Sequence, residues 1–281
     1  MKRKSDDLEK AIDKQLRDIN NERRLIDLPI EILTQVLSYL EFEDLRRECC
    51  RVSKAWRNAI TQIELIDILF VKTEKTIWLD QLEFARKYFT KVREIKFSWG
   101  HGSSIDDEGV YIAIRRLLFN SSILKHFQYK TCCNVHSRNQ INTLVNHALP
   151  IEPLVHADML ESLSICYDKV NQNDLNNLIC ILRDKFHLKV LRLCMPTIRK
   201  ADEQRKLQGM LGFIGDLHNL CELHLTNRGK TGFKVIGPLY LELILPRLNQ
   251  LEVLKLSHVV GQDLELISNH CPKLRSFSME G

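Results

Sequence analysis

The chain has 281 residues, of which 44% are hydrophobic and 27% are charged, and its formal net charge is +5. This composition indicates a globular protein with a sizeable core and excludes a largely disordered chain, because Gly (11) and Pro (7) are scarce. The small excess of 41 basic over 36 acidic residues argues against a dedicated nucleic-acid-binding protein.

The cysteines and the apolar runs predict where the protein resides. The chain has nine Cys, an odd number, and residues 1–24 are too polar for a secretory signal. The cysteines are therefore expected to be reduced, buried thiols of a cytoplasmic or nuclear protein. The most apolar run, residues 63–71, is interrupted by Glu64 and Asp67 and is shorter than the roughly 18 residues of a membrane span.

Residues 1–24 are expected to form a charged N-terminal tail or helix. Leu8, Ile12, Leu16 and Ile19 have a spacing that places them on one face of a helix. Such a stripe would dock on the rest of the protein or on a second copy. The alternative is a loosely helical, partly disordered tail, and the sequence leaves both interpretations open.

Three short helices are predicted in residues 25–62. Pro29 suits the first turn of the first helix, and Ser53 can cap the third. The apolar residues of the three helices are Ile32, Leu33, Val36, Leu37 and Leu40, then Leu45, Cys49 and Val52, and finally Trp56, Ala59, Ile60 and Ile63. So small a bundle is near the limit of independent stability, and its first helix is apolar over a wider arc than the bundle can cover. Residues 25–62 are therefore expected to dock on a partner or on the following domain.

Several short motifs in this region resemble the F-box, in order and in spacing. They are Leu28-Pro29-x-Glu31-Ile32, Val36-Leu37-Ser38-Tyr39-Leu40, Asp44-Leu45, Cys50-x-Val52-Ser53 and Trp56-Arg57. The pair Cys49-Cys50 departs from the more uniformly aliphatic pattern of many members. The resemblance implies docking on a Skp-type adaptor and, through it, on a cullin scaffold. The adaptor-binding residues that it implies are Leu28, Pro29, Ile32, Leu33, Val36, Leu37, Leu40, Leu45 and Trp56.

A Leu-x-x-Leu-x-Leu pattern recurs seven times in residues 91–281. Its first positions are Val92, Leu124, Leu160, Leu188, Leu220, Leu251 and Leu274. Apolar residues at helical spacing lie between these hits, for example in 110–118, 141–148 and 175–182. Each unit is thus predicted to be a short strand plus a helix, and stacked units would share one continuous core. Residues 63–90 are expected to form a helical linker.

The repeat array resembles leucine-rich repeats of the F-box-associated kind, and residues 263–274 look like their cysteine-containing subtype. The resemblance implies an α/β fold, in which a small three-helix F-box precedes an irregular leucine-rich-repeat solenoid with a parallel sheet on its concave face. It further implies a substrate receptor of a Skp–cullin–F-box ubiquitin ligase. The alternative is a leucine-rich-repeat scaffold that binds the adaptor without directing ubiquitination.

Alternation along each strand is expected to turn the residues between core positions onto the concave face. The candidate target-binding residues there are Lys96, His126, Lys130, Arg192, His224 and Lys255. This basic set favours an acidic or phosphorylated target. A merely solvated sheet face is the alternative.

No catalytic residue, cofactor or metal site is predicted, so the chain is not expected to be an enzyme. The Gly-Lys-Thr sequence at 229–231 lacks the glycine that a P-loop requires five positions earlier, where His224 stands. A zinc site was considered for His126, Cys132, Cys133 and His136. Their spacing matches no paired zinc-binding arrangement, and neither a membrane nor a nucleic acid is expected as a partner.

Overall fold

The computed structural model describes residues 28–70, 75–99, 108–131, 149–166, 172–194, 201–226, 238–257, 259 and 261–280. The chain divides into two compact units, with the boundary between Ile63 and Glu64. The aliphatic stripe expected in residues 1–24 and the helical pattern in 141–148 lie outside the described residues. No helix in the described ranges is both long and apolar enough to cross a membrane.

The first unit is a small helical bundle. Its elements are α2 (Ile30–Leu37), α3 (Phe42–Asp44), the π-helical turn η2 (Leu45–Cys49), α4 (Cys50–Val52) and α5 (Lys54–Ile60). The predicted cap of the last helix is confirmed, because Ser53 Oγ accepts a hydrogen bond of 3.2 Å from the amide of Trp56. The Thr34 hydroxyl donates to the carbonyl of Ala59 at 3.3 Å and joins α2 to α5. The core consists of Leu33, Leu37, Phe42, Leu45, Cys49, Ala59, Ile60 and Ile63.

The π-helical turn η2 changes which residues of the second predicted helix face the core. Leu45 and Cys49 are buried as expected, but 55% of Val52 is exposed. A π turn inserts one residue relative to α-helical spacing and rotates the following residues about the axis. The sequence places Leu45, Cys49 and Val52 on one face of an uninterrupted α-helix, and this prediction was wrong for Val52.

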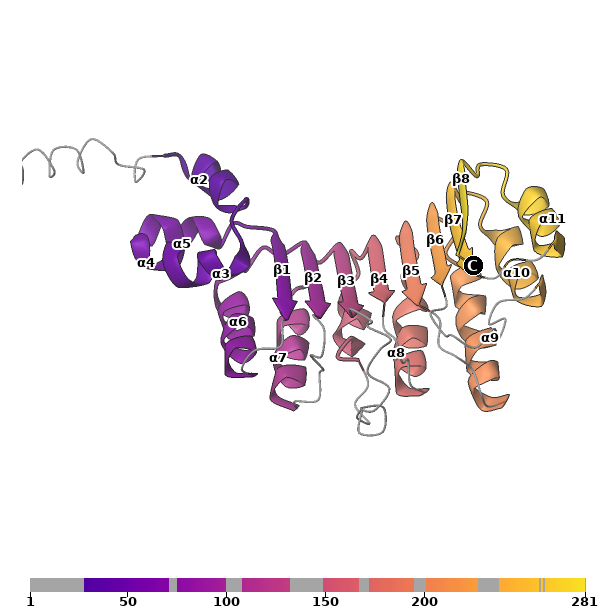
Figure 1. Cartoon of the computed structure of the whole chain (residues 1–281), viewed down its shortest axis with the longest axis horizontal. Coiled ribbons are helices and arrows are strands. Elements are labelled where there is room, and N and C mark those ends of the chain that lie inside the picture. The colour runs from indigo at the N-terminus through magenta and orange to yellow at the C-terminus, as the bar shows by residue number, and fades with distance from the viewer. Residues whose placement is uncertain are drawn as a thin grey trace, which may run out of the picture. The chain divides into compact units, whose positions relative to one another are not determined.

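The second unit contains an eight-stranded parallel sheet, in which the strands lie in chain order (Figure 1). The strands are β1 (Leu65–Phe70), β2 (Glu94–Trp99), β3 (His126–Thr131), β4 (Ser162–Cys166), β5 (Val190–Cys194), β6 (Glu222–Thr226), β7 (Val253–Ser257) and β8 (Ser276–Glu280). All seven strands predicted from the repeated pattern are present as β2 to β8.

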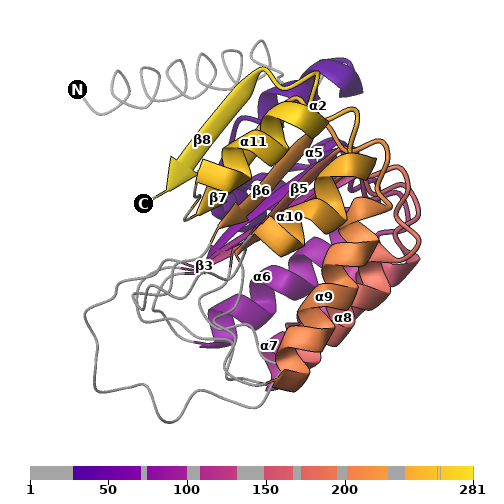
Figure 2. The same ribbon diagram turned by 90° about the vertical axis from the view of Figure 1, so that its right-hand side faces the viewer.

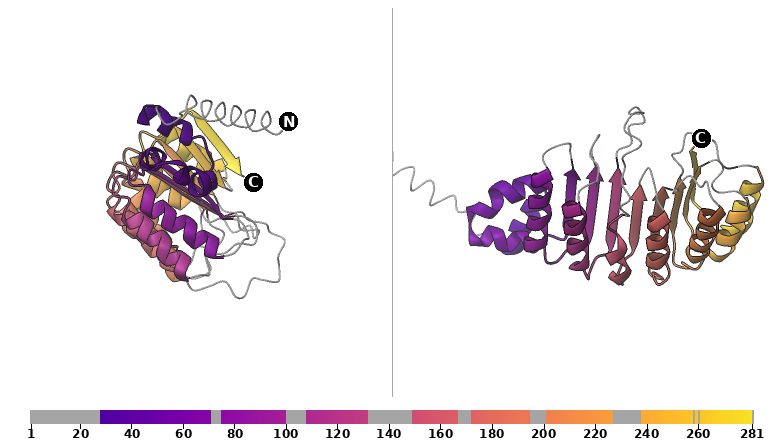
Figure 3. Two further views of the ribbon diagram at one scale, coloured as in Figure 1. Left: turned by 90° about the vertical axis from the view of Figure 1, so that its left-hand side faces the viewer. Right: turned by 90° about the horizontal axis from the view of Figure 1, so that it is seen from below.

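Helices connect successive strands and lie on one face of the sheet (Figures 2 and 3). They are α6 (Lys75–Tyr88), α7 (Glu108–Phe119), the 3-10 helix η3 (Glu152–His156), α8 (Gln172–Leu182), α9 (Ala201–Gly215), α10 (Pro238–Ile244), the 3-10 helix η4 (Leu245–Arg247) and α11 (Gly261–His270). The other face, called the open face below, carries no helix among the described residues. The predicted fold class, a small helical module followed by a repeat array on a parallel sheet, is confirmed.

Strand residues alternate between the core and the open face. In β4, Leu163 and Ile165 are at most 1% exposed, whereas their strand neighbours are partly exposed. The same alternation in β2 buries Ile95 and Phe97. It follows from the two-residue period of a strand and produces one continuous core between sheet and helices.

The expected helical linker at 63–90 was only partly correct. Residues 75–88 form α6, but Leu65–Phe70 is a strand that pairs in parallel with β2. The segment Ile63-x-x-Ile66-x-Ile68 repeats the spacing of the seven detected units with isoleucine in place of leucine. β-Branched side chains favour a strand over a helix, so the array begins one repeat earlier than predicted.

Candidate docking surfaces

Two apolar stripes run side by side along α2, and they face opposite environments. Leu33 and Leu37 are at most 1% exposed and pack in the bundle core. Ile32 and Val36, each one position earlier, are 46% and 45% exposed. One residue step turns a helix by about 100°, so neighbouring positions belong to separate stripes. The first unit therefore presents an apolar surface that its own core does not cover.

This surface is called the α2 face below. It consists of the exposed apolar residues Ile32 and Val36 of α2, together with Tyr39 and Leu40, which follow the helix. Tyr39 is 82% exposed, and Pro29 is also exposed at the start of the helix. Exposed apolar residues in this number on a small bundle are typical of a protein-interaction surface.

Burial divides the residues that were expected to bind the adaptor. Leu33, Leu37 and Leu45 are buried in the core, where they pack the helices together, and their contact with a partner stays a prediction. The exposed or half-exposed members are Leu28, Pro29, Ile32, Val36, Leu40 and Trp56. The distinction depends on where α5 packs against α2, which hydrophobic spacing within α2 does not reveal.

The open face of the sheet brings four of the six candidate target-binding residues into one row. These four are Lys96, Arg192, His224 and Lys255, which the strand register aligns across the sheet. The complete row, from β1 to β8, is Asp67, Lys96, Gln128, Ser164, Arg192, His224, Lys255 and Ser278. His126 and Lys130 lie in the rows on either side. All six side chains are at least partly exposed on this face.

Acidic neighbours offset the basic character that was expected of this face. Lys96 pairs with Glu94 at 2.7 Å on the same strand. Glu222 accepts from Arg192 at 2.5 Å and lies 3.0 Å from His224 Nε2. Lys96, Arg192 and His224 thus each lie beside a glutamate, so the open face is not uniformly positive.

The cysteines differ in exposure, contrary to the expectation that all would be buried. Among the described residues, Cys49, Cys194 and Cys271 are buried, whereas Cys180 is exposed. Burial raises the pKa of the Cys271 thiol to about 11. The described cysteines are all free thiols.

The two rejected chemical sites fall largely outside the described residues. These exclude the Gly-Lys-Thr sequence at 229–231 and the zinc candidates Cys132, Cys133 and His136. Within the part of the chain that the structure describes, no group of three metal-ligating side chains is found.

Comparison with known proteins identifies the first unit. Residues 25–66 match the family model described as F-box-like. A comparison with curated proteins gave no match. A solved tropomodulin C-terminal domain from Caenorhabditis elegans is 12% identical, with a TM-score of 0.36 over 72% of this chain and 93% of that chain. That likeness is too slight to support an inference about function, so the F-box-like segment bearing the α2 face is what the chain shares with a known family.

Proposed function

We propose that this chain is the substrate-recognition subunit of a Skp–cullin–F-box ubiquitin ligase. The α2 face would bind the Skp-type adaptor, and the repeats would bind a protein target. The observation that carries the proposal is the exposed apolar stripe of Ile32 and Val36 within a segment that matches the F-box-like model. Burying the exposed half of each of these side chains contributes about 1 kcal/mol, so the two together contribute about 2 kcal/mol to the free energy of docking.

The proposed mechanism is positional. The adaptor and the cullin would hold the chain near a ubiquitin-charged enzyme, while the repeats hold the target. Tethering raises the effective concentration of a target lysine, so this chain requires no catalytic residue of its own. The proposal also entails a cytoplasmic or nuclear location, where such ligases act.

Adaptor binding tests the first half of the proposal. The double variant Pro29→Ala/Ile32→Asp is expected to abolish co-purification with a Skp-type adaptor, because it places a charge on the α2 face. Leu243→Asp is a matched control, since Leu243 has the same 46% exposure on α10. The control is expected to bind as the wild type does, and thermal unfolding should show that both variants remain folded. Unchanged binding by the double variant would contradict the proposal.

Ubiquitin transfer separates the receptor from its alternative. A leucine-rich-repeat scaffold would also bind the adaptor through the α2 face, but it would not bring in an active ligase. Reconstitution with adaptor, cullin and charged enzyme, followed by identification of ubiquitinated proteins, is expected to reveal targets that the double variant loses. Adaptor binding without any such target would favour the scaffold.

A further inference from the structure

A groove runs along the edge of the sheet where helices turn into strands β4 to β7. Its volume is about 480 Å³, within the range of ligand clefts. It is lined by the turn residues Met159, His187, Asn219 and Gln250, called the first row, and by Glu161, Lys189 and Cys221, called the second row. The second-row residues immediately precede β4, β5 and β6, and each lies two positions after a first-row residue. The regular repeat thus supplies both rows of this groove, which is called the edge groove below.

The backbone along the second row is already hydrogen-bonded. The Glu161 carbonyl accepts from the amides of Lys189 and Val190 at 2.8 and 3.1 Å. The Lys189 carbonyl likewise accepts from the amides of Cys221 and Glu222 at 2.8 and 3.0 Å. An occupant therefore has no free strand edge to extend at these positions, and side chains must provide the recognition.

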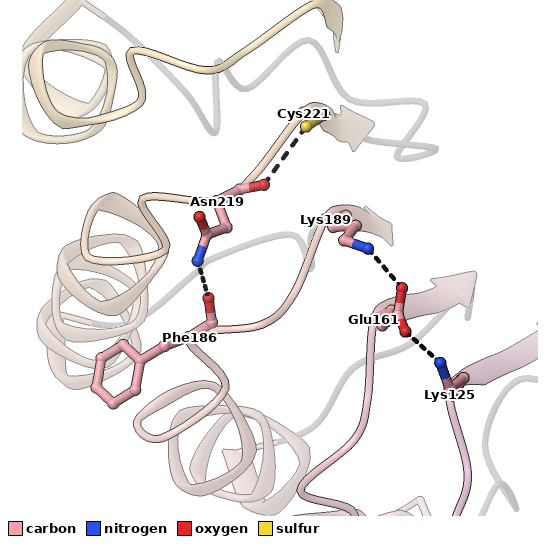
Figure 4. Close-up of polar contacts among 6 residues, drawn as sticks. All are labelled: Lys125, Glu161, Phe186, Lys189, Asn219 and Cys221. Atoms are coloured by element: carbon pink, nitrogen blue, oxygen red, sulfur yellow. Dashed lines mark hydrogen bonds and ion pairs between the residues drawn. The ribbon is translucent and has the colours of Figure 1, made fainter.

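One end of the edge groove has an excess positive charge. Glu161 lies between two lysines, and its oxygens accept from Lys125 and Lys189 at 2.7 Å each (Figure 4). Hydrogen bonds from these lysines lower the pKa of Glu161 to about 2, and the same contact raises the pKa of Lys189. Two ammonium groups thus share one carboxylate and retain donors for a second acceptor.

The middle of the edge groove is held in place by one contact between repeats and one within a turn. Asn219 Nδ2 donates to the Phe186 carbonyl of the preceding repeat at 2.8 Å, and Cys221 Sγ lies 3.5 Å from the Asn219 carbonyl of its own turn (Figure 4). Met159, which lines the groove two positions before Glu161, is 51% exposed. Exposed apolar surface therefore lies in the same groove as Lys189, an arrangement that fits an acidic residue with an apolar neighbour.

We propose that the edge groove binds an extended peptide segment of a protein partner, with an Asp or Glu side chain at Lys189. The interval from β4 to β7 is about 14 Å, which an extended chain crosses in about four or five residues. No arginine is among the described residues that line the groove, and its excess charge is small. Both features favour one carboxylate over a phosphate, which arginine forks hold best. The identity of this partner as the ubiquitination target rests on the proposed function, whereas peptide binding itself does not.

Selection of peptides on the full chain tests this inference. A phage-displayed library of random eight-residue peptides is expected to yield sequences that share one Asp or Glu beside an apolar residue. Synthetic peptides from this selection should bind Lys189→Glu at least about tenfold more weakly. Selection repeated on Lys189→Glu should no longer enrich acidic residues.

Arg93→Glu provides the matched control. Arg93 occupies the position equivalent to Lys189 in the β2 repeat, outside the groove, and is 52% exposed against 58% for Lys189. It is expected to change peptide affinity by less than about twofold. The inference is overturned if no acidic sequence is enriched, or if Arg93→Glu weakens peptide binding as much as Lys189→Glu does. It is also overturned if peptide binding is lost in Lys96→Glu, on the open face, instead of in Lys189→Glu. Adaptor pull-down is independent of these measurements, so failure of the receptor proposal would be recognised separately.

Discussion

Lys185 donates a hydrogen bond of 2.7 Å from its ammonium group to the main-chain carbonyl of Val155, 30 residues earlier in the chain. The lysine side chain is only 2% exposed, and it forms an ion pair of 3.6 Å with Asp158, which is 91% exposed. A buried cation held by a neutral carbonyl and a solvated carboxylate is an uncommon link between repeats. The hydrogen bond from Lys185 to Val155 joins the turn after α8 to η3.

Replacing this lysine tests the link. Lys185→Met keeps the aliphatic stem but leaves the Val155 carbonyl without its donor, and it is expected to cost about 1–2 kcal/mol at neutral pH. Burial lowers the pKa of Lys185 from 10.5, so the unfolded chain binds more protons between that lowered pKa and 10.5. The stability of the wild type relative to the variant should therefore rise with pH across this window. Urea unfolding at pH 7.5 and pH 10 measures it, and an unchanged difference would contradict the pKa argument.

Two glycines of α9 are expected to respond in opposite ways to the same substitution. A Cβ at Gly209 would have no heavy atom within 4 Å, so Gly209→Ala should stabilise the protein by about 0.5–1 kcal/mol through helix propensity. A Cβ at Gly215 would lie 3.1 Å from the Leu243 carbonyl oxygen, a backbone atom that cannot easily move. Gly215→Ala is therefore expected to destabilise the packing of α9 on α10. Thermal unfolding of both variants gives the comparison, and stabilisation by both would show that the contact at Gly215 is unimportant.

The repeat pattern was predictable from apolar spacing, since alternation of core positions is a property of the strand itself. The first repeat has the same spacing in Ile63, Ile66 and Ile68, so it was as predictable as the leucine-free unit of Val92, Ile95 and Phe97. On α2, by contrast, Ile32 and Leu33 both belong to one apolar pattern. Only the position of α5 decides that Leu33 is buried and Ile32 exposed.

The edge groove was not predictable in the same way, because its lining residues come from turns of successive repeats. Glu161 is 36 residues from Lys125 and 28 residues from Lys189, and the register of the sheet brings the three together. A signal does exist in the sequence. The residue after the first core position of these three repeats alternates in charge, which becomes visible once the repeats are aligned.

The contacts of Glu161 with Lys125 and Lys189 predict that replacing Glu161 costs less stability at acid pH than at neutral pH. Its pKa is lowered to about 2 in the folded chain, whereas the ordinary value is 4.5. The unfolded chain thus binds more protons between these values, so the contribution of Glu161 is complete above about pH 4.5 and is lost as the pH falls through about 2. Because Glu161 and its lysines are partly solvated, we expect Glu161→Gln to cost only about 0.5–1 kcal/mol at pH 7, with a smaller cost near pH 3.

Glu252 offers the control for this prediction. It stands in the same row of the array but has a single, looser ion pair, in which Arg275 lies 3.4 Å away and is 80% exposed. Glu252→Gln is expected to change stability by less than about 0.5 kcal/mol at either pH, because an exposed single pair contributes little. Urea unfolding of both variants at pH 7 and pH 3 measures the difference. Equal effects of the two substitutions would mean that the shared contact with two lysines does not stabilise the array.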